Sequence, residues 1–551
     1  IAFAVGPWEL VEFDAIPKTA LRDHVIPLRG VAAKGQSPRM RYMLGETAKI
    51  VIALEDYFDF AYPYDKLDLL AAPDFAYGAM ENPGLITYRD SLMFVDLKSA
   101  TSQRRGAIGT HAHELGHQWF GDVVTMPWWD DIWLNEAFAT WISAKITQGL
   151  YPELEADMDL LGRGLDAMGS DSLATARRIH NPVDDWTEVS STFDGITYQK
   201  GGAVLSMMER YLGRDKFRAA LRAHMRKFAF ADATSTDLAD SLSAQSDQPE
   251  VLRKAFASFT DQPGVPMLDT TLACTHGKAT LRVAQSRYAP IGASFPGTGT
   301  WLVPMCVRVG RGDASAVECH LLDAANSSVA LSGDTCPDYV HPNADGAGYY
   351  RFRLDPAAQA ALNAAFAKLN PFEQRVLADS VGAAFDAGAL SVSEYLDAAP
   401  RFATATQGDV ITAPLGNLEW IKERVATAAQ RDRIDAMLRD IWGEHLRKLG
   451  IEPGATESES TKSLRTDLVD ALIEHGQPKW LMDELAARGR RVLGLGGDGR
   501  LAVDSVHRDL LAPSLRAAVM TDGAKAFDLA EQHLARNEDS VVRSALMAAL
   551  T

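Results

Sequence analysis

The spacing of hydrophobic residues predicts that helices alternate with short strands in the first half of the chain. From about residue 39 to residue 58, hydrophobic side chains recur at the three- and four-residue intervals of an amphipathic helix. Short hydrophobic runs at 67–71 and 84–88 predict strands. Residues 103–120 and 133–149 return to helical spacing, and further helices follow them. We therefore expect an α+β arrangement in this region.

The pattern changes twice in the second half. Residues 265–354 alternate hydrophobic with polar side chains and are punctuated by Gly and Pro, which predicts a small antiparallel β domain. After residue 355 the chain becomes rich in Ala and helical in period. Asn370, Pro371 and Glu373 match the N-cap, first-turn Pro and capping-box Glu of a helix start. No strict repeat period is found, but stacked helix pairs are expected.

The charge balance narrows the choice of partners. The 551 residues include 55 Lys and Arg against 73 Asp and Glu, which gives a formal net charge of -18. This charge would repel a polyanion, so no nucleic-acid partner is expected. No apolar run reaches the roughly 18 residues that a membrane span needs. The opening residues 1–5 are too short, and lack the basic flank, to be a signal peptide.

The cysteines bear on the cellular compartment of the protein. All four fall inside one short stretch, at Cys274, Cys306, Cys319 and Cys336. An even number confined to one segment predicts two disulfides, and therefore a periplasmic or secreted protein. Four buried, reduced thiols in a cytoplasmic protein are the alternative. The sequence does not determine how the cysteines pair.

The candidate chemistry is concentrated in the sequence His113-Glu114-Leu115-Gly116-His117, an H-E-x-x-H motif. On a helix, residues four apart lie about 40° apart around the axis and roughly 6 Å along it, so both imidazoles can bind one zinc ion. Glu114 would lie beside the metal without binding it, where it can activate a water molecule. The alternative is a solvated helix face with two ordinary histidines. His111 would point about 160° away from His113, and we expect it to be structural.

Glu136 is the expected third metal ligand. Eighteen residues separate it from His117, enough for a short turn and a returning helix that brings its carboxylate back over the histidines. Three protein ligands leave a fourth position open, which is the arrangement of a catalytic zinc site. One zinc ion per chain is expected.

Four sequence blocks together resemble the zinc aminopeptidases of the aminopeptidase N type, a family that also includes leukotriene-type epoxide hydrolases. Besides the H-E-x-x-H motif and Asn135-Glu136, they are Gly78-Ala79-Met80-Glu81-Asn82 and the nine residues 193–201, which include Tyr198. The order and spacing of the blocks match the family throughout residues 74–202. The later segments match its domain order more weakly.

The resemblance implies a multidomain α+β protein, with the N-terminal β domain of the family missing or truncated. The expected domains are a thermolysin-like zinc peptidase domain, a small antiparallel β-sandwich and a helical domain of stacked helix pairs. Their boundaries are expected at 1–12 for the end of the N-terminal domain, 13–262 for the catalytic domain, 263–355 for the β-sandwich and 356–551 for the helical domain.

The resemblance also assigns substrate roles. Glu81 would hold the free α-ammonium of a peptide, with help from Glu136, so that peptides with a blocked N-terminus are rejected. Tyr198 would donate a hydrogen bond to the oxyanion of the tetrahedral intermediate. Gly78 and Ala79 would pair with the peptide backbone as an added strand. The remaining expected substrate-binding residues are Met80, Asn82 and Tyr77, the last as a wall of the pocket for the first side chain.

One residue departs from the family pattern. Pro83 stands where the family usually has Trp, and its missing backbone donor is tolerable on an edge strand but alters local substrate contacts.

The expected function is zinc-dependent removal of N-terminal amino acids from peptides. Three alternatives remain open from the motifs alone. The first is an epoxide hydrolase of the same fold acting on a lipid, which shares the zinc ligands and Tyr198. The second is an inactive scaffold that binds partners through its helical domain. The third is an endopeptidase, which Glu81 disfavours. The preferred substrate and the oligomeric state are not encoded in any pattern found.

Overall fold

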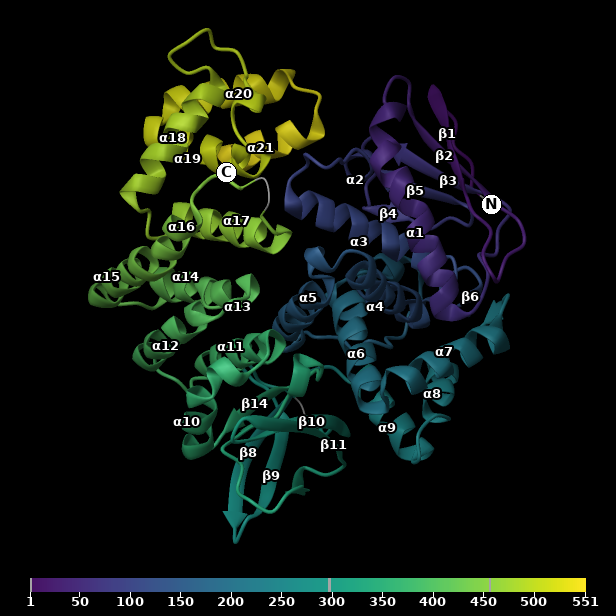
Figure 1. Cartoon of the computed structure of the whole chain (residues 1–551), viewed down its shortest axis with the longest axis vertical. Helices are drawn as coiled ribbons and strands as arrows, with labels where there is room; N and C mark the ends of the chain where they lie inside the picture. The colour runs from purple at the N-terminus through teal and green to yellow at the C-terminus, as the bar shows by residue number, and fades with distance from the viewer. Residues whose placement is uncertain (1, 296–298, 455–456) are drawn as a thin grey trace. The chain divides into compact units, whose positions relative to one another are not determined.

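The structure is a computed structural model that describes residues 2–295, 299–454 and 457–551. The chain forms two compact units, the first comprising Ile1–Tyr88 and Ile108–Ser391 and the second Arg89–Ala107 and Val392–Thr551 (Figure 1). The four domains expected from the sequence are finer than these two units, and their boundaries stay a prediction.

The first unit begins with a five-stranded sheet in the order β1-β2-β3-β5-β4. β1 and β2 are antiparallel, β2 and β3 are parallel, and the two-residue β4 pairs antiparallel with β5 at the edge of the sheet. The strands expected at 67–71 and 84–88 are confirmed as β3 and β5. The five strands are β1 (Trp8–Ile16), β2 (Ile26–Ala33), β3 (Leu67–Ala72), β4 (Ala79–Met80) and β5 (Leu85–Arg89).

Helices of the first unit pack around α4 (Ile132–Leu150). The helix expected at 133–149 is confirmed as α4, which is buried on nearly all sides, including Trp133, Phe138 and Trp141. The helix expected at 103–120 is confirmed as α3 but ends at His117, where the chain turns and the Gly121 N–H donates to the Val124 carbonyl at 2.8 Å. The helices up to residue 260 are α1 (Arg41–Phe58), α2 (Asp90–Met93), α3 (Thr101–His117), α4 (Ile132–Leu150), α5 (Ala156–Asp171), α6 (Gly201–Leu212), α7 (Arg214–Phe228), α8 (Ser235–Ser243) and α9 (Pro249–Thr260). Of these, α2 and the part of α3 up to Ala107 belong to the second unit. The two-residue strands β6 (Val124–Thr125) and β7 (Ala231–Asp232) pair with each other.

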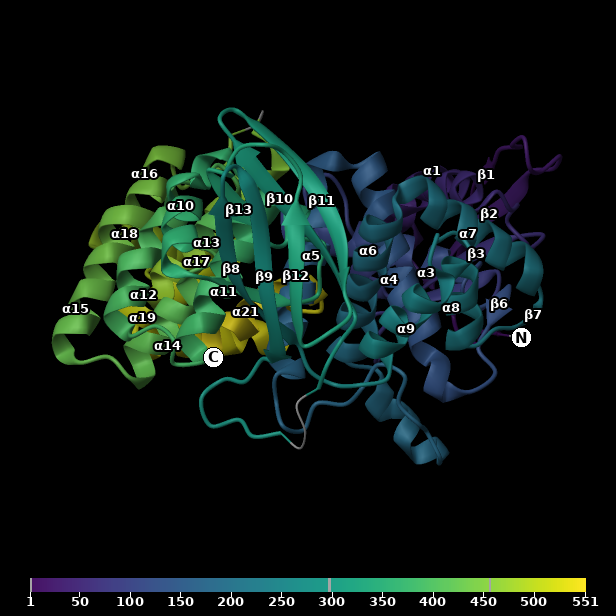
Figure 2. The ribbon, with the colours of Figure 1, turned by 90° about the horizontal axis from the view of Figure 1, so that it is seen from below.

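Strands β8 to β14 form two sheets, ordered β12-β9-β8-β14 and β11-β10-β13 (Figure 2). All pairs are antiparallel except β14 with β8. Two disulfides are present, as expected: Cys306–Cys319 joins directly opposite residues of β10 and β11, and Cys274–Cys336 closes a longer loop. The strands are β8 (Pro266–Thr275), β9 (Lys278–Arg287), β10 (Val303–Arg311), β11 (Ala314–Leu322), β12 (Asn326–Leu331), β13 (Tyr339–His341) and β14 (Arg351–Leu354).

The rest of the described chain is helical, as the Ala-rich pattern predicts. The capping box of Asn370 and Glu373 starts α11. Toward the C-terminus, Leu493, Leu515 and Leu546 share one buried core. No helix of the described residues is both long and apolar enough to cross a membrane. The helices are α10 (Pro356–Ala364), α11 (Pro371–Asp386), α12 (Val392–Ala398), α13 (Gly408–Thr412), α14 (Leu415–Arg424), α15 (Ala428–Met437), α16 (Gly443–Leu449), α17 (Glu459–Glu474), α18 (Lys479–Leu493), α19 (Leu511–Asp522), α20 (Ala524–Arg536) and α21 (Ser540–Leu550).

A fully buried ion pair lies where the helical region meets the β segment. Lys200 Nζ lies 2.9 Å from Asp171 Oδ2, and neither side chain is exposed. Asp171 also accepts hydrogen bonds from the Gly264 N–H at 2.7 Å and the Tyr349 hydroxyl at 3.2 Å. One carboxylate therefore ties together α5, the segment before α6, the start of the β segment and the loop before β14.

We expect Asp171→Asn to lower the free energy of unfolding by about 3–5 kcal/mol, because it leaves Lys200 buried without a counter-charge. Asp159→Asn is the control: it removes an exposed pair with Arg163 on the same helix and should cost no more than about 1 kcal/mol. Urea unfolding followed by tryptophan fluorescence measures both. Equal stability of the two variants would contradict the assigned role of Asp171.

Candidate active site

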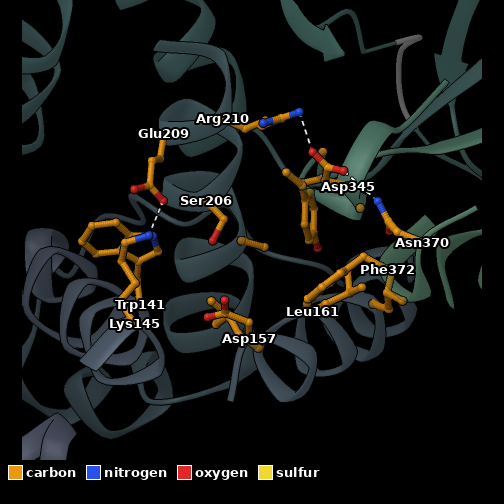
Figure 3. Close-up of a pocket in the computed structure, with 18 of the residues that line it drawn as sticks. Trp141, Lys145, Asp157, Leu161, Ser206, Glu209, Arg210, Asp345, Asn370 and Phe372 are labelled. Atoms are coloured by element: carbon orange, nitrogen blue, oxygen red, sulfur yellow. Dashed lines mark hydrogen bonds and ion pairs between the residues drawn. The ribbon is translucent and has the colours of Figure 1, made fainter. Parts of the chain in front are cut away.

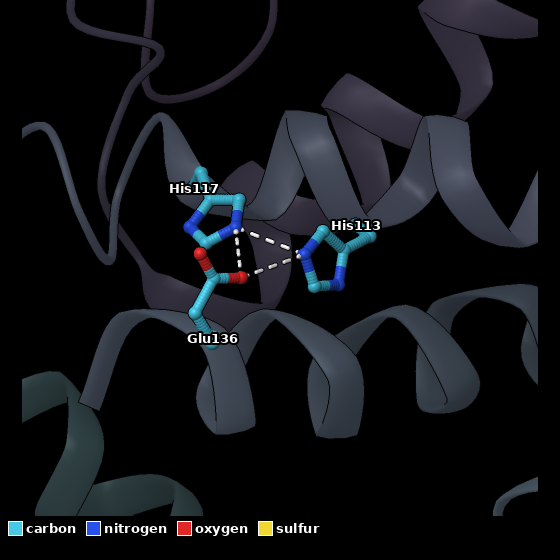
Figure 4. Close-up of side chains that lie close together, drawn as sticks. All are labelled: His113, His117 and Glu136. Atoms are coloured by element: carbon cyan, nitrogen blue, oxygen red, sulfur yellow. Dashed lines mark hydrogen bonds and ion pairs between the residues drawn. The ribbon is translucent and has the colours of Figure 1, made fainter. Parts of the chain in front are cut away.

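The two histidines of the H-E-x-x-H motif and Glu136 come together as expected. His113 and His117 project from the last turn of α3, and Glu136 projects from α4 (Figure 4). His117 Nε2 lies 3.0 Å from His113 Nε2, and Glu136 Oε2 lies 3.3 Å from each of these nitrogens. His117 and Glu136 are buried, and the His113 side chain is 15% exposed. The three atoms are close enough to share one metal ion.

Two glycines allow the helices to approach this closely. A Cβ atom at Gly116 would lie 2.9 Å from Ile142 Cγ2 of α4, so a larger residue would separate α3 from α4. A Cβ atom at Gly201 would collide with the Cβ atom of Ala137, the residue after Glu136. The carboxylate of Glu136 is thus positioned by close contacts on two sides of α4.

The charges around the cluster favour a cation. Burial raises the pKa of Glu136, but the imidazoles of His117 and His113 outweigh burial and hold it below its usual range. Burial lowers the pKa of His117, yet the carboxylates of Glu81 and Glu136 raise it well above its usual value. The His117 Nδ1 lies 3.0 Å from the Phe120 carbonyl, so an Nδ1–H donates there. A metal would bind at Nε2 in place of the second ring proton. Two imidazole nitrogens and one carboxylate oxygen fit the ligand set of zinc, with a fourth position left open.

Glu114 has the features expected of a group that handles a proton. It is buried, and its Oε2 atom has no hydrogen-bond partner among the described residues. Burial, followed by the nearby Glu81 and Glu136, raises its pKa well above the usual value. A buried carboxylate oxygen without a donor calls for a partner that the protein itself does not supply, such as a water molecule or a substrate proton.

Tyr198 faces the same cluster from a π-helical turn, Ile196–Lys200, that leads into α6. Its ring stacks on His113 with 6.1 Å between centroids. Burial and Glu136 raise the pKa of Tyr198 far above its usual value, so the phenol stays protonated and can donate. Asp194 starts this turn by accepting the backbone N–H groups of Ile196 and Thr197.

Glu81 lies directly after the edge strand β4, with Oε1 3.9 Å from His117 Nδ1. β4 pairs with β5 through Ala79 and Met80, and Gly78 precedes it. Tyr77 is 66% exposed. The substrate contacts of Tyr77, Gly78, Ala79, Met80 and Asn82 stay predictions.

Pro83 and Gly84 form a turn. The Leu85 N–H closes this turn by donating to the Asn82 carbonyl at 2.9 Å, so Pro fits this position.

Gln118 is a positioning residue that sequence reasoning missed. Its side chain is fully buried. Its Nε2 donates to the Glu81 carbonyl at 2.7 Å and to Asp122 Oδ2 at 2.9 Å, and its Oε1 accepts the Gly84 N–H at 3.1 Å. It therefore holds the Glu81 segment against the end of α3. Its position one residue after the motif is the only signal in the sequence.

His111 is structural, as expected. It is fully buried, with Nδ1 2.8 Å from the Tyr88 hydroxyl and Nε2 3.0 Å from the Thr47 hydroxyl. Burial lowers its pKa to about 3, so it stays neutral.

Comparison with known proteins identifies the family. Residues 42–262 match the peptidase family M1 domain, and residues 339–551 match the ERAP1-like C-terminal domain. Aminopeptidase M1-B of Oryza sativa subsp. japonica is 31% identical, over 86% of this chain and 54% of its own length. Aminopeptidase M1 of Arabidopsis thaliana is 31% identical, over 88% of this chain and 55% of its own length. The puromycin-sensitive aminopeptidase of Caenorhabditis elegans is 29% identical, over 72% of this chain and 42% of its own length. The chain thus spans about half the length of the curated relatives it matches.

The fold is accordingly a mixed α+β fold with an M1-type domain and a helical C-terminal domain. The chain belongs to the aminopeptidase N-type peptidase family M1, as its four motifs predicted.

We expect His117→Ala to lower the zinc content of the purified protein from about one ion per chain to near zero, because it removes one of three ligands. The control is His24→Ala, which changes an exposed histidine outside the cluster and should leave the zinc content unchanged. Inductively coupled plasma mass spectrometry after dialysis measures both. Full zinc content in His117→Ala would contradict the assigned ligand set.

Proposed function

We propose that this chain carries the active site of a zinc-dependent aminopeptidase, with one zinc ion held by His113, His117 and Glu136. The observation that carries the proposal is the position of Glu81. Its carboxylate lies at a fixed place beside the ligand cluster, 3.9 Å from His117 Nδ1. A free α-ammonium bound there would present the first peptide carbonyl to the metal position, so that cleavage is counted from the N-terminus.

The residues of the chain supply the remaining steps. Bound zinc would act as a Lewis acid and lower the pKa of the attacking water. The edge of β4 would pair with the peptide backbone, and Glu81 would accept hydrogen bonds from the ammonium. Glu114 would take a proton from the water and pass it to the departing amine. Tyr198 would donate a hydrogen bond to the oxyanion that forms on the attacked carbonyl.

Three further features belong to this proposal. The two sheets formed by strands β8 to β14 would pack as a β-sandwich. The substrates would be peptides with a free N-terminus. The two disulfides favour a periplasmic or secreted protein, with the cytoplasm as the alternative.

We expect Glu114→Gln to keep its zinc and to lose about 10²–10⁴-fold in kcat, because the amide cannot accept a proton. Hydrolysis of aminoacyl p-nitroanilides, measured beside zinc content, tests this. Glu153→Gln changes an exposed glutamate outside the site and should match the unmodified protein. Unchanged kcat in Glu114→Gln would rule out its role as the base.

We expect N-acetylation of the reporter to abolish turnover, because it removes the ammonium that Glu81 would bind. Glu81→Gln should raise KM for the free-amine reporter by about 10–100-fold, the value of one charged hydrogen bond. Steady-state kinetics on the matched reporters distinguishes the alternatives. Turnover of the acetylated reporter would favour an endopeptidase. If the zinc-loaded protein turned over neither reporter, the result would favour the alternatives of an epoxide hydrolase or an inactive scaffold.

A further inference from the structure

A cavity lies in the first unit, away from the candidate active site (Figure 3). It has a volume of about 410 Å³ and is bounded by α4, α5, α6, a loop around residues 345–349 and the start of α11 at residues 370–372. None of the metal-ligand, catalytic or substrate-binding residues assigned above lines it. Lys145, which does line it, is nine residues after Glu136, a rotation of about 180° around a helix. The cavity therefore lies behind α4 as seen from the zinc ligands.

One part of the lining is apolar. The side chains come mainly from α5 and from the start of α6, and Leu165 and Met168 are among the most buried. The apolar lining side chains include Leu160, Leu161, Leu165, Met168, Ala203 and Phe372. Such a surface favours a hydrocarbon group of a ligand.

The charged lining residues are balanced in number, three cationic and three anionic, and most are paired. Lys145 Nζ lies 2.6 Å from Glu209 Oε2. Arg210 pairs with Asp345, which also accepts a hydrogen bond from Asn370 (Figure 3). These pairs leave Asp157 and Arg214 as the lining charges without such a partner among the described residues.

Asp157 is the lining carboxylate that lacks an ion-pair partner among the described residues. It is partly buried on α5, and no described residue donates a hydrogen bond to its carboxylate. The Ser206 hydroxyl lies across the cavity and likewise has no hydrogen-bond partner among the described residues (Figure 3). Burial raises its pKa, and the nearby positive charges of Lys145 and Arg214 oppose that rise. A carboxylate in this position is stabilised by a cationic hydrogen-bond donor.

We propose that this cavity binds a zwitterionic α-amino acid with an apolar side chain. The ammonium would donate to Asp157 and Ser206, the carboxylate would pair with Arg214 on the exposed rim, and the side chain would pack on the apolar lining. The zero net charge of the lining residues matches a ligand with one charge of each sign. Binding itself does not depend on the proposed function. If that function holds, the ligand belongs to the same chemical class as the released product.

The cavity has direct structural links to the candidate active site. Its α4 wall carries Glu136 about two and a half turns before Lys145, and its α6 wall continues the π-helical turn of Tyr198. A ligand that fixes the spacing of α4 and α6 would therefore act on a metal ligand and on the oxyanion donor together.

Photo-crosslinking tests the proposal without requiring turnover. The probe is a diazirine analogue of L-leucine, which keeps both charged groups, and the labelled peptides are identified by mass spectrometry after irradiation. We expect labelling within residues 157–168 or 203–214 that excess L-leucine blocks. N-acetyl-leucine and leucinamide, which each lack one charge, should compete at least about tenfold less well.

Two variants and one control decide the assignment. Asp157→Asn and Arg214→Gln should each reduce labelling of these segments about tenfold or more. Arg214 is exposed, so its replacement tests the site even if Asp157→Asn folds poorly. Asp159→Asn, two residues away and paired with Arg163, should label normally. Labelling confined to residues 77–82 or 113–117, labelling unaffected in Arg214→Gln, or equal competition by leucinamide would each overturn the proposal.

Discussion

The candidate active site depends on how closely two segments approach α4. Gly116 allows α3 to lie against Ile142, and Gly201 allows the start of α6 to lie against Ala137. These contacts place both imidazoles and the Tyr198 ring within reach of one carboxylate, that of Glu136. Because helix packing is close and stiff, a side chain at either glycine would alter metal geometry and oxyanion geometry together.

Much of this arrangement could be predicted from the sequence, because the relevant information is local. The spacing of His113 and His117 on a helix fixes their common face, and the pattern of hydrophobic residues indicated α3 and α4 with their intervening turn. Predicting that Glu136 lies beside the histidines required knowing that the two helices pack against each other. The eighteen-residue spacing allowed such packing and the family blocks supported it, and the structure brings the three side chains together.

Other parts could not be predicted, because they arise between segments far apart in sequence. Gln118 looks like an ordinary polar residue until the Glu81 segment lies against it. The pair of Lys200 with Asp171 and the cavity behind α4 depend likewise on packing of α5 against α6. The end of α3 at His117 is set by backbone hydrogen bonds to residues beyond the helix, and periodicity alone extended it three residues further.

The two disulfides are nested, since Cys306–Cys319 lies wholly inside the 62-residue span closed by Cys274–Cys336. A protease that cuts the backbone once, anywhere between Cys274 and Cys336, would therefore leave both fragments covalently attached. A cut between Cys306 and Cys319 would be bridged twice. In an oxidising compartment, the β segment would thus survive a single nick as one molecule, and separation would require reduction as well as cleavage.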